Sequence, residues 1–433
     1  MLEAKGRYLY KDGKRFFYLA DTCWSAFTSI EMPDWRYYLD TRKFQGYNAV
    51  QINILRQWDS SLPIKGREPF AIVEHEDGSY EYDYTKINEA YFDNAEKMLA
   101  EMIKRNMVPV LVLLWGNFVP GTWMSNFTKN NVMPFEQIKP YVEYVVKRFK
   151  KYDPIWFVTG DVGFAEKEGQ EIEEPTRYYR EVLQSAKSVD PDGIYTFHIN
   201  GESHELPEDF LKQASFFIYQ SGHGKNGQAT AYTIPQLMRK NGYTGPMMDA
   251  EICYEGFTKM TPPQEKSTEV ERYTSYDVRK AAWKAVLSGA DMGIGYGCFG
   301  IWPWNDTAHP EQKLGMNFNV EIVPYDWRQC LQLPGASDMG ILKELVMEYG
   351  AQGLEPIASP SKNNPAIRAA QNDEYLLVYL PTAGIFDFKE IGINPDNVKI
   401  IDLDKRHVLT GKLVDGVLQM MPVREDSLLI VKK

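Results

Sequence analysis

The sequence predicts a (β/α)8 TIM barrel followed by a small antiparallel β-sandwich. Residues 16–304 alternate between short apolar runs and longer amphipathic stretches, which is the βαβα order of a parallel sheet. Most of the apolar runs are continuously hydrophobic, as expected of strands that are buried on both faces. After residue 365 the helical periodicity ends, and short β-rich runs separated by turn residues replace it.

Eight apolar runs are predicted to form the barrel strands. They are short, rich in β-branched, leucine and aromatic residues, and bounded by polar or turn-forming residues. They lie at 16–20, 49–54, 108–115, 155–159, 194–199, 216–220, 247–250 and 293–299.

The stretches between these strands carry apolar residues at helical spacing. In the second predicted helix, for example, Phe92, Ala95, Leu99 and Met102 fall on one face. A turn signal at 190–193 (D-P-D-G) then leads into the fifth strand. Helices are predicted at 33–45, 87–106, 135–151, 175–189, 276–288 and 339–348.

The predicted domain boundaries follow from a proline-rich segment. Residues 1–353 are expected to form the barrel, and 354–365, with three prolines and two serines, to form a linker. Residues 366–433 are expected to form the small β-sandwich. Its strands are predicted at 367–370, 375–380, 399–402, 417–421 and 428–431.

Composition narrows the class of partner. The formal net charge of −11 over 433 residues argues against a nucleic-acid partner, because binding a polyanion requires a positive surface. No run approaches the roughly 18–20 apolar residues of a membrane span. The chain is 13% aromatic, with 10 Trp and 27 Tyr, and flat aromatic rings suit the apolar faces of sugars. We therefore expect a carbohydrate partner. The oligomeric state is left open, and a monomer is compatible with the sequence.

The four cysteines are Cys23, Cys253, Cys298 and Cys330, and none lies in a C-x-x-C motif. This pattern disfavours a zinc site and predicts buried thiols rather than a disulfide framework. We expect no cofactor. The N-terminus lacks a basic start followed by an apolar stretch, so the sequence indicates either a cytoplasmic protein or an exported one whose signal has been removed.

Two acidic residues each close a predicted strand. Asp161 ends the run I-W-F-V-T-G-D, and Glu251 ends P-M-M-D-A-E. Barrels carry their catalytic groups at the carboxyl ends of the strands. A pair of carboxylates at one mouth can hydrolyse a glycosidic bond. Either acid could instead cap a helix or belong to a buried ion pair.

Polar and indole groups follow nearly every other predicted strand, as a pocket for a hydroxyl-rich ligand requires. Arg56 could instead pair with Asp21, His198 could be a core histidine, and Trp58 and Trp123 could simply cover the barrel. The candidate substrate-binding residues are Asp21, Trp24, Asn53, Arg56, Trp115, Asn117, His198, Asn200, Tyr219, Gln220, His223, Tyr254, Trp302 and Trp304.

Two other functions remain open at this point. One is a carbohydrate-binding barrel whose acids have lost catalysis. The other is a metal-dependent hydrolase that uses His198, Glu202 and His204, although H-x-H and H-x-x-x-H spacings are absent from the sequence. There is neither a G-x-S-x-G elbow nor a G-x-G-x-x-G loop that precedes a helix.

Several motifs together resemble the apiosidase-like family of glycoside hydrolases, over about residues 5–350. They are K-D-G-K-R-F-F-Y-L-A-D-T-C-W, F-Q-G-Y-N-A-V-Q, V-T-G-D, Y-Q-S-G-H and M-D-A-E-x-x-Y-E-G. The resemblance implies a (β/α)8 barrel with Asp161 as acid/base and Glu251 as the second catalytic carboxylate. The tail from about 366 is similar to a small β-domain, often labelled collagen-binding, that is appended to such proteins.

The sequence departs from better-known barrel glycosidases at one point. Those enzymes carry Asn-Glu at the end of strand four, where this chain has Gly160-Asp161. Because Asp is one methylene shorter than Glu, the backbone must bring the acid closer to the substrate, and ordinary cellulase activity is not expected. We expect Glu251 to be the nucleophile, and the two carboxyl groups to lie about 5–6 Å apart, as in a retaining pair.

Overall fold

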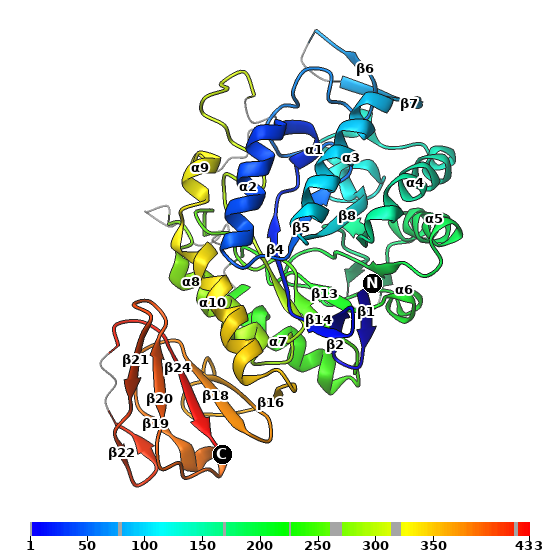
Figure 1. Cartoon of the computed structure of the whole chain (residues 1–433). Coiled ribbons are helices and arrows are strands. Elements are labelled where there is room, and N and C mark those ends of the chain that lie inside the picture. The colour runs from blue at the N-terminus through cyan, green and yellow to red at the C-terminus, as the bar shows by residue number, and fades with distance from the viewer. Residues whose placement is uncertain are drawn as a thin grey trace.

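The computed structural model describes residues 2–76, 80–167, 170–224, 227–259, 271–312, 322–419 and 423–433. Its largest sheet has eight parallel strands in the order β12-β9-β8-β5-β4-β15-β14-β13. Of these, β4, β5, β8, β13 and β14 are labelled in Figure 1. The sheet closes between β12 and the segment just before β13, where Ser215 N donates to Tyr195 O over 2.8 Å. The predicted barrel is therefore confirmed.

All eight barrel strands overlap the predicted runs, but the fifth and eighth end three residues earlier than predicted, at Thr196 and Tyr296, and the first begins later. Residues 14–16 belong instead to an N-terminal antiparallel sheet made of β1 (Leu2–Lys5), β2 (Tyr8–Lys11) and β3 (Lys14–Phe16). The barrel strands are β4 (Tyr18–Thr22), β5 (Ala49–Asn53), β8 (Val108–Trp115), β9 (Ile155–Gly160), β12 (Ile194–Thr196), β13 (Phe217–Tyr219), β14 (Met247–Asp249) and β15 (Gly293–Tyr296).

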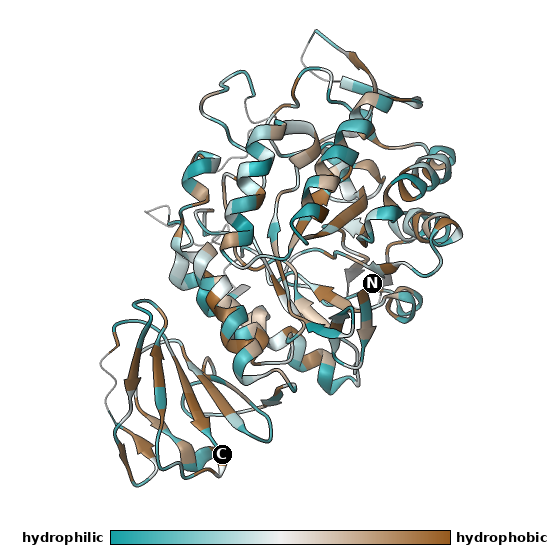
Figure 2. Cartoon of the chain, viewed as in Figure 1, coloured by the Kyte–Doolittle hydropathy of each residue, from teal (hydrophilic) through white to brown (hydrophobic). Residues whose placement is uncertain are grey.

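Helices surround the strands, and the hydropathy colouring marks the strands as the apolar centre (Figure 2). Six helices correspond to predicted ones: α2 (Met32–Phe44), α3 (Glu89–Lys104), α4 (Phe135–Phe149), α5 (Glu173–Val189), α8 (Ser275–Val286) and α10 (Pro334–Tyr349). Four others lack a clear periodic signal, because they are short or contain an internal proline: α1 (Ala26–Ser29), α6 (Glu208–Gln213), α7 (Gly227–Lys240) and α9 (Trp327–Cys330).

Two hairpins interrupt the barrel pattern. One consists of β6 (Phe70–Glu74) and β7 (Tyr80–Ile87), and the other of β10 (Ala165–Lys167) and β11 (Gln170–Glu171). Short 3-10 turns η1 (Gly116–Phe118), η2 (Met124–Asn126) and η3 (Lys129–Asn131) follow β8. These insertions follow the carboxyl ends of β5, β8 and β9, so they extend the loops of the predicted mouth.

The C-terminal region forms two antiparallel sheets with a core of their own. Positions 420 and 421 of the predicted strand 417–421 lie outside the described residues. The six-stranded sheet contains, in order, β16 (Glu355–Ile357), β17 (Arg368–Gln371), β18 (Tyr375–Leu380), β24 (Ser427–Lys432), β20 (Lys399–Asp402) and β21 (His407–Thr410). The other contains β19 (Phe386–Asp387), β23 (Val417–Leu418) and β22 (Leu413–Val414).

Strand β16 corrects the expected linker. Residues 355–357 pair with β17 along three positions, so part of the segment 354–365 belongs to the C-terminal sheet. Proline is tolerated there because β16 is an edge strand, where a missing N–H leaves no ladder bond unmade.

A buried charge cluster joins the C-terminal sheets to the barrel. Arg279 of α8 lies 2.8 Å from Asp426 and 2.9 Å from Asp338 of α10. Beside it, the ring of Trp283 stacks on Tyr379 of β18, with 6.3 Å between the ring centroids. The C-terminal region thus packs against helices α8 and α10.

The cysteine prediction needs one correction. Cys298 and Cys330 form a disulfide, whereas Cys23 and Cys253 are buried free thiols as expected. The pair is separated by 32 residues and belongs to no short motif. It comes together because the loop after β15 folds back on α9, where Tyr325 N donates to Phe299 O.

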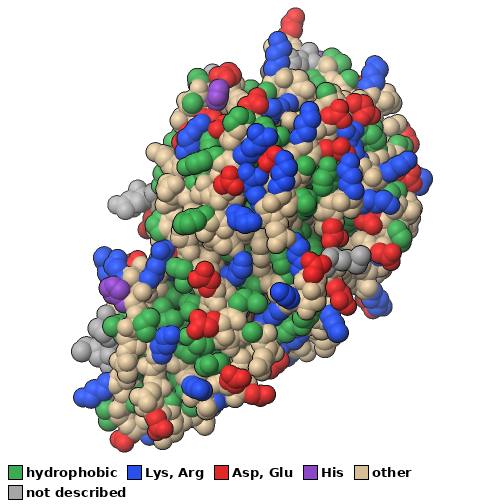
Figure 3. All heavy atoms as spheres, viewed as in Figure 1, with side chains coloured by type: hydrophobic (Ala, Val, Ile, Leu, Met, Phe, Trp, Pro, Cys, Tyr) green, Lys and Arg blue, Asp and Glu red, His purple; other side chains and the backbone are tan. Residues whose placement is uncertain are grey.

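On the face shown in Figure 3, acidic and basic side chains are interspersed, and neither kind forms a dominant patch. Over the described ranges, no helix combines the length and apolar content that a bilayer crossing requires.

Candidate active site

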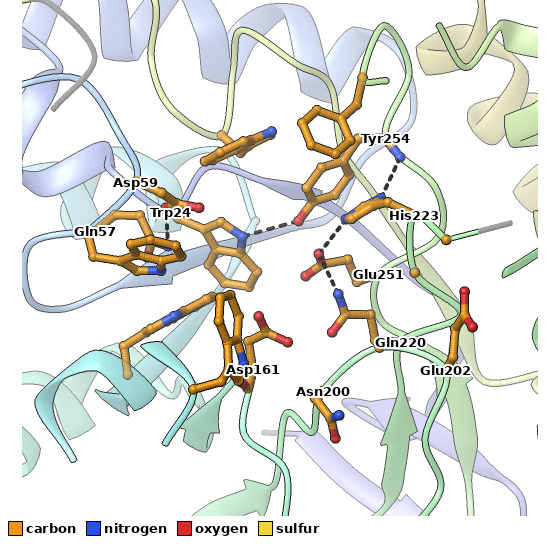
Figure 4. A pocket seen from close by; sticks show the side chains of 18 residues that line it. Trp24, Gln57, Asp59, Asp161, Asn200, Glu202, Gln220, His223, Glu251 and Tyr254 are labelled. Atoms are coloured by element: carbon orange, nitrogen blue, oxygen red, sulfur yellow. Dashed lines mark hydrogen bonds and ion pairs between the residues drawn. The ribbon is translucent and has the colours of Figure 1, made fainter. Parts of the chain in front are cut away.

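A cavity of 350 Å³ opens at the carboxyl ends of the barrel strands (Figure 4). Asp161 and Glu251 both line it, although they come from different strands. This volume lies at the small end of the range for ligand pockets. The other lining residues are Trp24, Gln57, Trp58, Asp59, Trp115, Trp123, Asn200, Gly201, Glu202, Gln220, Gly222, His223, Gly224, Tyr254, Phe257 and Trp302.

Glu251 is surrounded by hydrogen-bond donors. Gln220 Nε2 donates to its Oε1 over 3.0 Å, and His223 Nε2 lies 2.9 Å from the same oxygen. His198 Nε2 lies 3.2 Å from Oε2, but the contact is not aligned as a hydrogen bond. Burial alone would raise the pKa of Glu251, but the two histidines outweigh it and lower the pKa to about 2. Glu251 is therefore a carboxylate at neutral pH.

Each of the two histidines is oriented by a backbone N–H that donates to its Nδ1. Asp161 N donates to His198 Nδ1 over 3.0 Å, and Tyr254 N donates to His223 Nδ1 over 3.3 Å. A nitrogen that accepts a backbone N–H carries no proton of its own, so each ring presents a protonated Nε2 to Glu251. His198 thus positions Glu251 from a fully buried location rather than lining the cavity.

Asp161 lies in the opposite electrostatic environment. Burial and the nearby charge of Glu251 raise the pKa of Asp161 to about 7. Its backbone has φ of 55°, a left-handed conformation that costs a non-glycine residue about 1–3 kcal/mol. The strained turn is held by the bond to His198 and by Trp123 Nε1, which donates to Asp161 O over 3.2 Å.

The glycine that precedes Asp161 is required by close packing. A Cβ at Gly160 would lie 2.3 Å from the Trp115 ring. The indole therefore lies directly on the backbone, at a position where a larger residue could be accommodated only by moving Trp115. The backbone position of Gly160-Asp161 therefore depends on the packing of the Trp115 ring.

Aromatic groups extend the donor network around Glu251. Trp24 Nε1 donates to the Tyr254 hydroxyl over 3.1 Å, and the Trp24 ring packs edge-on against Trp115 at 4.8 Å. Burial and the charge of Glu251 raise the pKa of Tyr254 well above its usual value. Tyr254 therefore keeps its proton and remains able to donate.

A third carboxyl group in the cavity was not predicted. Gln57 Nε2 donates to Asp59 Oδ1 over 2.6 Å, and Asn53 Nδ2 in turn donates to Gln57 Oε1 over 3.0 Å. Burial raises the pKa of Asp59 to about 7, and the charges of Asp161 and Glu251 add to the effect. The signal that could have found it is the string Q-W-D at 57–59, a few residues past the second strand.

The structure brings seven of the predicted substrate-binding residues to the cavity: Trp24, Trp115, Asn200, Gln220, His223, Tyr254 and Trp302. Trp58 and Trp123, which were left open, also line it. Glu202, named above only for the metal-dependent alternative, lines it too. The cavity-lining residues that the prediction omitted, besides Asp59, are Gln57, Phe257 and three glycines.

The other seven predicted substrate-binding residues do not line the cavity: His198, described above, and six more. Asp21 is fully buried and pairs with Arg42 over 2.6 Å. Arg56 pairs with Glu68 over 2.8 Å, not with Asp21.

The remaining four are held inside the fold. Asn53 supports Gln57, as described above. The Tyr219 hydroxyl donates to Ala231 O over 2.7 Å, and Trp304 stacks on Trp327 with centroids 4.5 Å apart. Asn117 is buried in η1. In the described part of the chain, no group of three or more His, Cys, Asp or Glu is arranged to hold a metal ion.

Comparison with known families now adds to this geometry. The model of the family described as "Apiosidase-like, catalytic domain" matches residues 3–352. The chain belongs to the apiosidase-like family. It is accordingly a glycoside hydrolase, and the resemblance seen in the sequence is confirmed. The comparison with curated proteins finds no match.

Solved structures similar to this apiosidase-like chain support the fold. One is described as a glycoside hydrolase; it is 20% identical with a TM-score of 0.77, and the match covers 100% of this chain and 96% of that one. Another is a family 5 glycoside hydrolase from Bacteroides vulgatus, 20% identical with a TM-score of 0.76, and that match covers 100% and 93%. At such identity the likeness concerns the fold alone.

Proposed function

We propose that this protein hydrolyses O-glycosidic bonds in a plant or microbial polysaccharide or oligosaccharide, through a retaining mechanism. Asp161 would serve as acid/base and Glu251 as nucleophile. The substrate class we favour is a side-chain sugar of the apiosyl type, following the family. The observation that carries the proposal is a pair of carboxyl groups in one cavity whose surroundings move their pKa values apart, to about 7 and about 2.

In the first step, Asp161 gives its proton to the glycosidic oxygen while a Glu251 oxygen attacks the anomeric carbon. The bond between that carbon and the glycosidic oxygen breaks, and the leaving sugar departs as a neutral alcohol. A glycosyl ester on Glu251 remains. Gln220 and His223 orient the attacking carboxylate and hold it ionised.

In the second step, Asp161 acts as the base. Its carboxylate takes a proton from a water molecule, whose oxygen attacks the anomeric carbon and displaces Glu251. The sugar is released with retained configuration. Because Asp161 must alternate between acid and base, a pKa near 7 suits both half-reactions better than the ordinary value of an aspartate.

The test is a panel of aryl glycosides and plant oligosaccharides, including apiosyl compounds, assayed with wild-type protein and with Glu251→Gln. Proton NMR of the first anomer released would determine the stereochemistry. We expect turnover with retention in the wild type and none in the variant. If the wild type binds oligosaccharides yet releases no sugar, the carbohydrate-binding alternative would replace this proposal. A product of inverted configuration would refute the nucleophile role of Glu251.

A further inference from the structure

Three aromatic rings form a continuous surface at the edge of the cavity. Trp58 follows β5, whereas Trp123 and Phe127 come from the loop after β8. The Trp58 ring lies 5.5 Å from Trp123 and stacks on Phe127 at 5.6 Å, measured between centroids. We call these three residues the aromatic platform.

The platform extends from the cavity into solvent. Trp58 is 6% exposed, Trp123 46% and Phe127 60%. Trp58 and Trp123 line the cavity, but Phe127 does not. Large apolar rings are normally buried. Several such rings that stay exposed beside a pocket are therefore typical of a ligand-contacting surface.

The loop that carries the outer rings is held by its own hydrogen bonds. Thr122 Oγ1 donates to Gly116 O over 2.7 Å, and Ser125 Oγ donates to Thr122 O over 2.9 Å. Phe127 N closes the turn on Met124 O over 2.9 Å. Trp115 Nε1 also lies 3.2 Å from Met124 Sδ. The rings are therefore displayed by a fixed turn that is anchored to the floor of the cavity.

The platform is attached to the proposed proton donor. Trp123 Nε1 donates to the backbone oxygen of Asp161 over 3.2 Å. A general acid must lie within hydrogen-bond reach of the atom that it protonates, which here is the glycosidic oxygen of the leaving sugar. The leaving sugar must therefore start on the Asp161 side, next to Trp123.

We propose that the aromatic platform is the subsite for the leaving group, and that it binds the apolar face of the sugar ring to which the cleaved residue was attached. The inference rests on the proposed function. It assigns the enclosed cavity to the sugar that is cleaved off, and the partly open platform to the part of the chain that continues into solvent. Binding energy gained there, away from the reacting carbon, would hold the glycosidic oxygen against Asp161.

The experiment compares two substrates that share the cleaved sugar. One is an apiosyl disaccharide, whose leaving group is a sugar ring. The other is apiosyl fluoride, whose leaving group neither reaches the platform nor requires a proton. The test variants are Phe127→Ala, which leaves the contact with Asp161 intact, and Trp123→Phe, which keeps a ring but removes the N–H. Phe44→Ala is the matched control, since Phe44 is 92% exposed at the end of α2.

For Phe127→Ala we expect kcat/KM to fall about tenfold to thirtyfold on the disaccharide, mainly through KM, and to remain at the wild-type value on the fluoride. Its pH profile should not change. Trp123→Phe keeps a ring, so loss of stacking should reduce its kcat/KM on the disaccharide less than in Phe127→Ala. It should nevertheless lower kcat on the disaccharide, because Asp161 is less well held. Phe44→Ala should match the wild type on both substrates.

Equal losses on both substrates, or no loss on the disaccharide, would overturn the subsite. Failure of the proposed function would show differently, as wild-type protein that turns over neither substrate. In that case tryptophan fluorescence titration with the disaccharide would still decide the binding claim. Affinity that Phe127→Ala leaves unchanged would refute it, and affinity reduced at least tenfold would support it.

Discussion

The clearest consequence of the site is a pH profile with two identifiable limbs. The proposed mechanism needs Glu251 ionised and Asp161 protonated. Activity should therefore be lost as the pH falls through about 2, the pKa of Glu251, and as it rises through about 7, the pKa of Asp161. The acidic limb depends on the donors around Glu251, so removing one of them should move it.

We choose His223→Phe as the perturbation, because it keeps a ring of similar size against Tyr254 while removing the donor 2.9 Å from Glu251 Oε1. A hydrogen bond to a charged acceptor contributes about 1.5–3 kcal/mol. At about 1.4 kcal/mol per pKa unit, its loss raises the pKa of Glu251 by roughly 1–2 units. The acidic limb should move from about 2 to roughly 3–4.

The assay is kcat/KM against pH on a substrate that the panel identifies, with circular dichroism at each pH to show that the protein remains folded. His309→Phe is the matched control, because His309 is exposed and pairs only with Glu311 among the contacts described. The alkaline limb should rise only slightly above 7, since Glu251 is still charged there and His223 is the smallest of the influences on the pKa of Asp161. An acidic limb that does not move in a folded variant, or a shift confined to the alkaline limb, would refute this account of Glu251.

Three further predictions follow from named contacts. Asp161→Asn should lose about 10²–10⁴-fold on natural sugars but little on aryl glycosides with good leaving groups, and equal losses on both in steady-state assays would remove Asp161 from the acid role. Gly160→Ala should lower the free energy of unfolding by about 1–3 kcal/mol and reduce kcat, because its Cβ would displace Trp115; an unchanged urea midpoint and kcat would contradict the packing argument. Cys298→Ala should lower the free energy of unfolding by about 2–4 kcal/mol, because the disulfide to Cys330 is lost. If the disulfide accounts for this loss, the variant and reductant-treated wild type should have the same thermal midpoint.

Much of the fold could be predicted because burial leaves a periodic record in the sequence. The strand at 108–115 was found at its observed bounds, since all eight of its residues are buried and apolar. Helix α7 was missed, and Pro235 inside it argues against a helix, although α4 was predicted despite an internal proline at Pro140. Strand β16 was missed because Pro356 is one of several prolines in a segment whose composition indicated a linker. Tertiary pairing overrode local preference in both cases.

The site was harder to predict than the barrel, because a polar residue at a strand end can point to either side. Asp21 and Asp161 both close apolar runs, yet Asp21 meets Arg42 and Tyr38 of α2 and so faces the helix layer. The partner that decides the orientation comes from a different element, which a periodic pattern does not record. Asp59 shows the converse limit, since it reaches the cavity from within a loop, where no periodicity applies.

The Gly160-Asp161 pair shows why the acid and its surroundings must be considered as one unit. An aspartate reaches less far than a glutamate, so its backbone has to lie nearer the substrate. Gly160 allows that approach by leaving room for Trp115, and the left-handed turn at Asp161 then directs the side chain into the cavity. The N–H of the same turn donates to His198, and His198 in turn contacts Glu251. One strained peptide thus places the proposed proton donor and fixes the tautomer of a histidine that helps to hold Glu251, the proposed nucleophile, ionised. A change at this turn should therefore affect both carboxyl groups together.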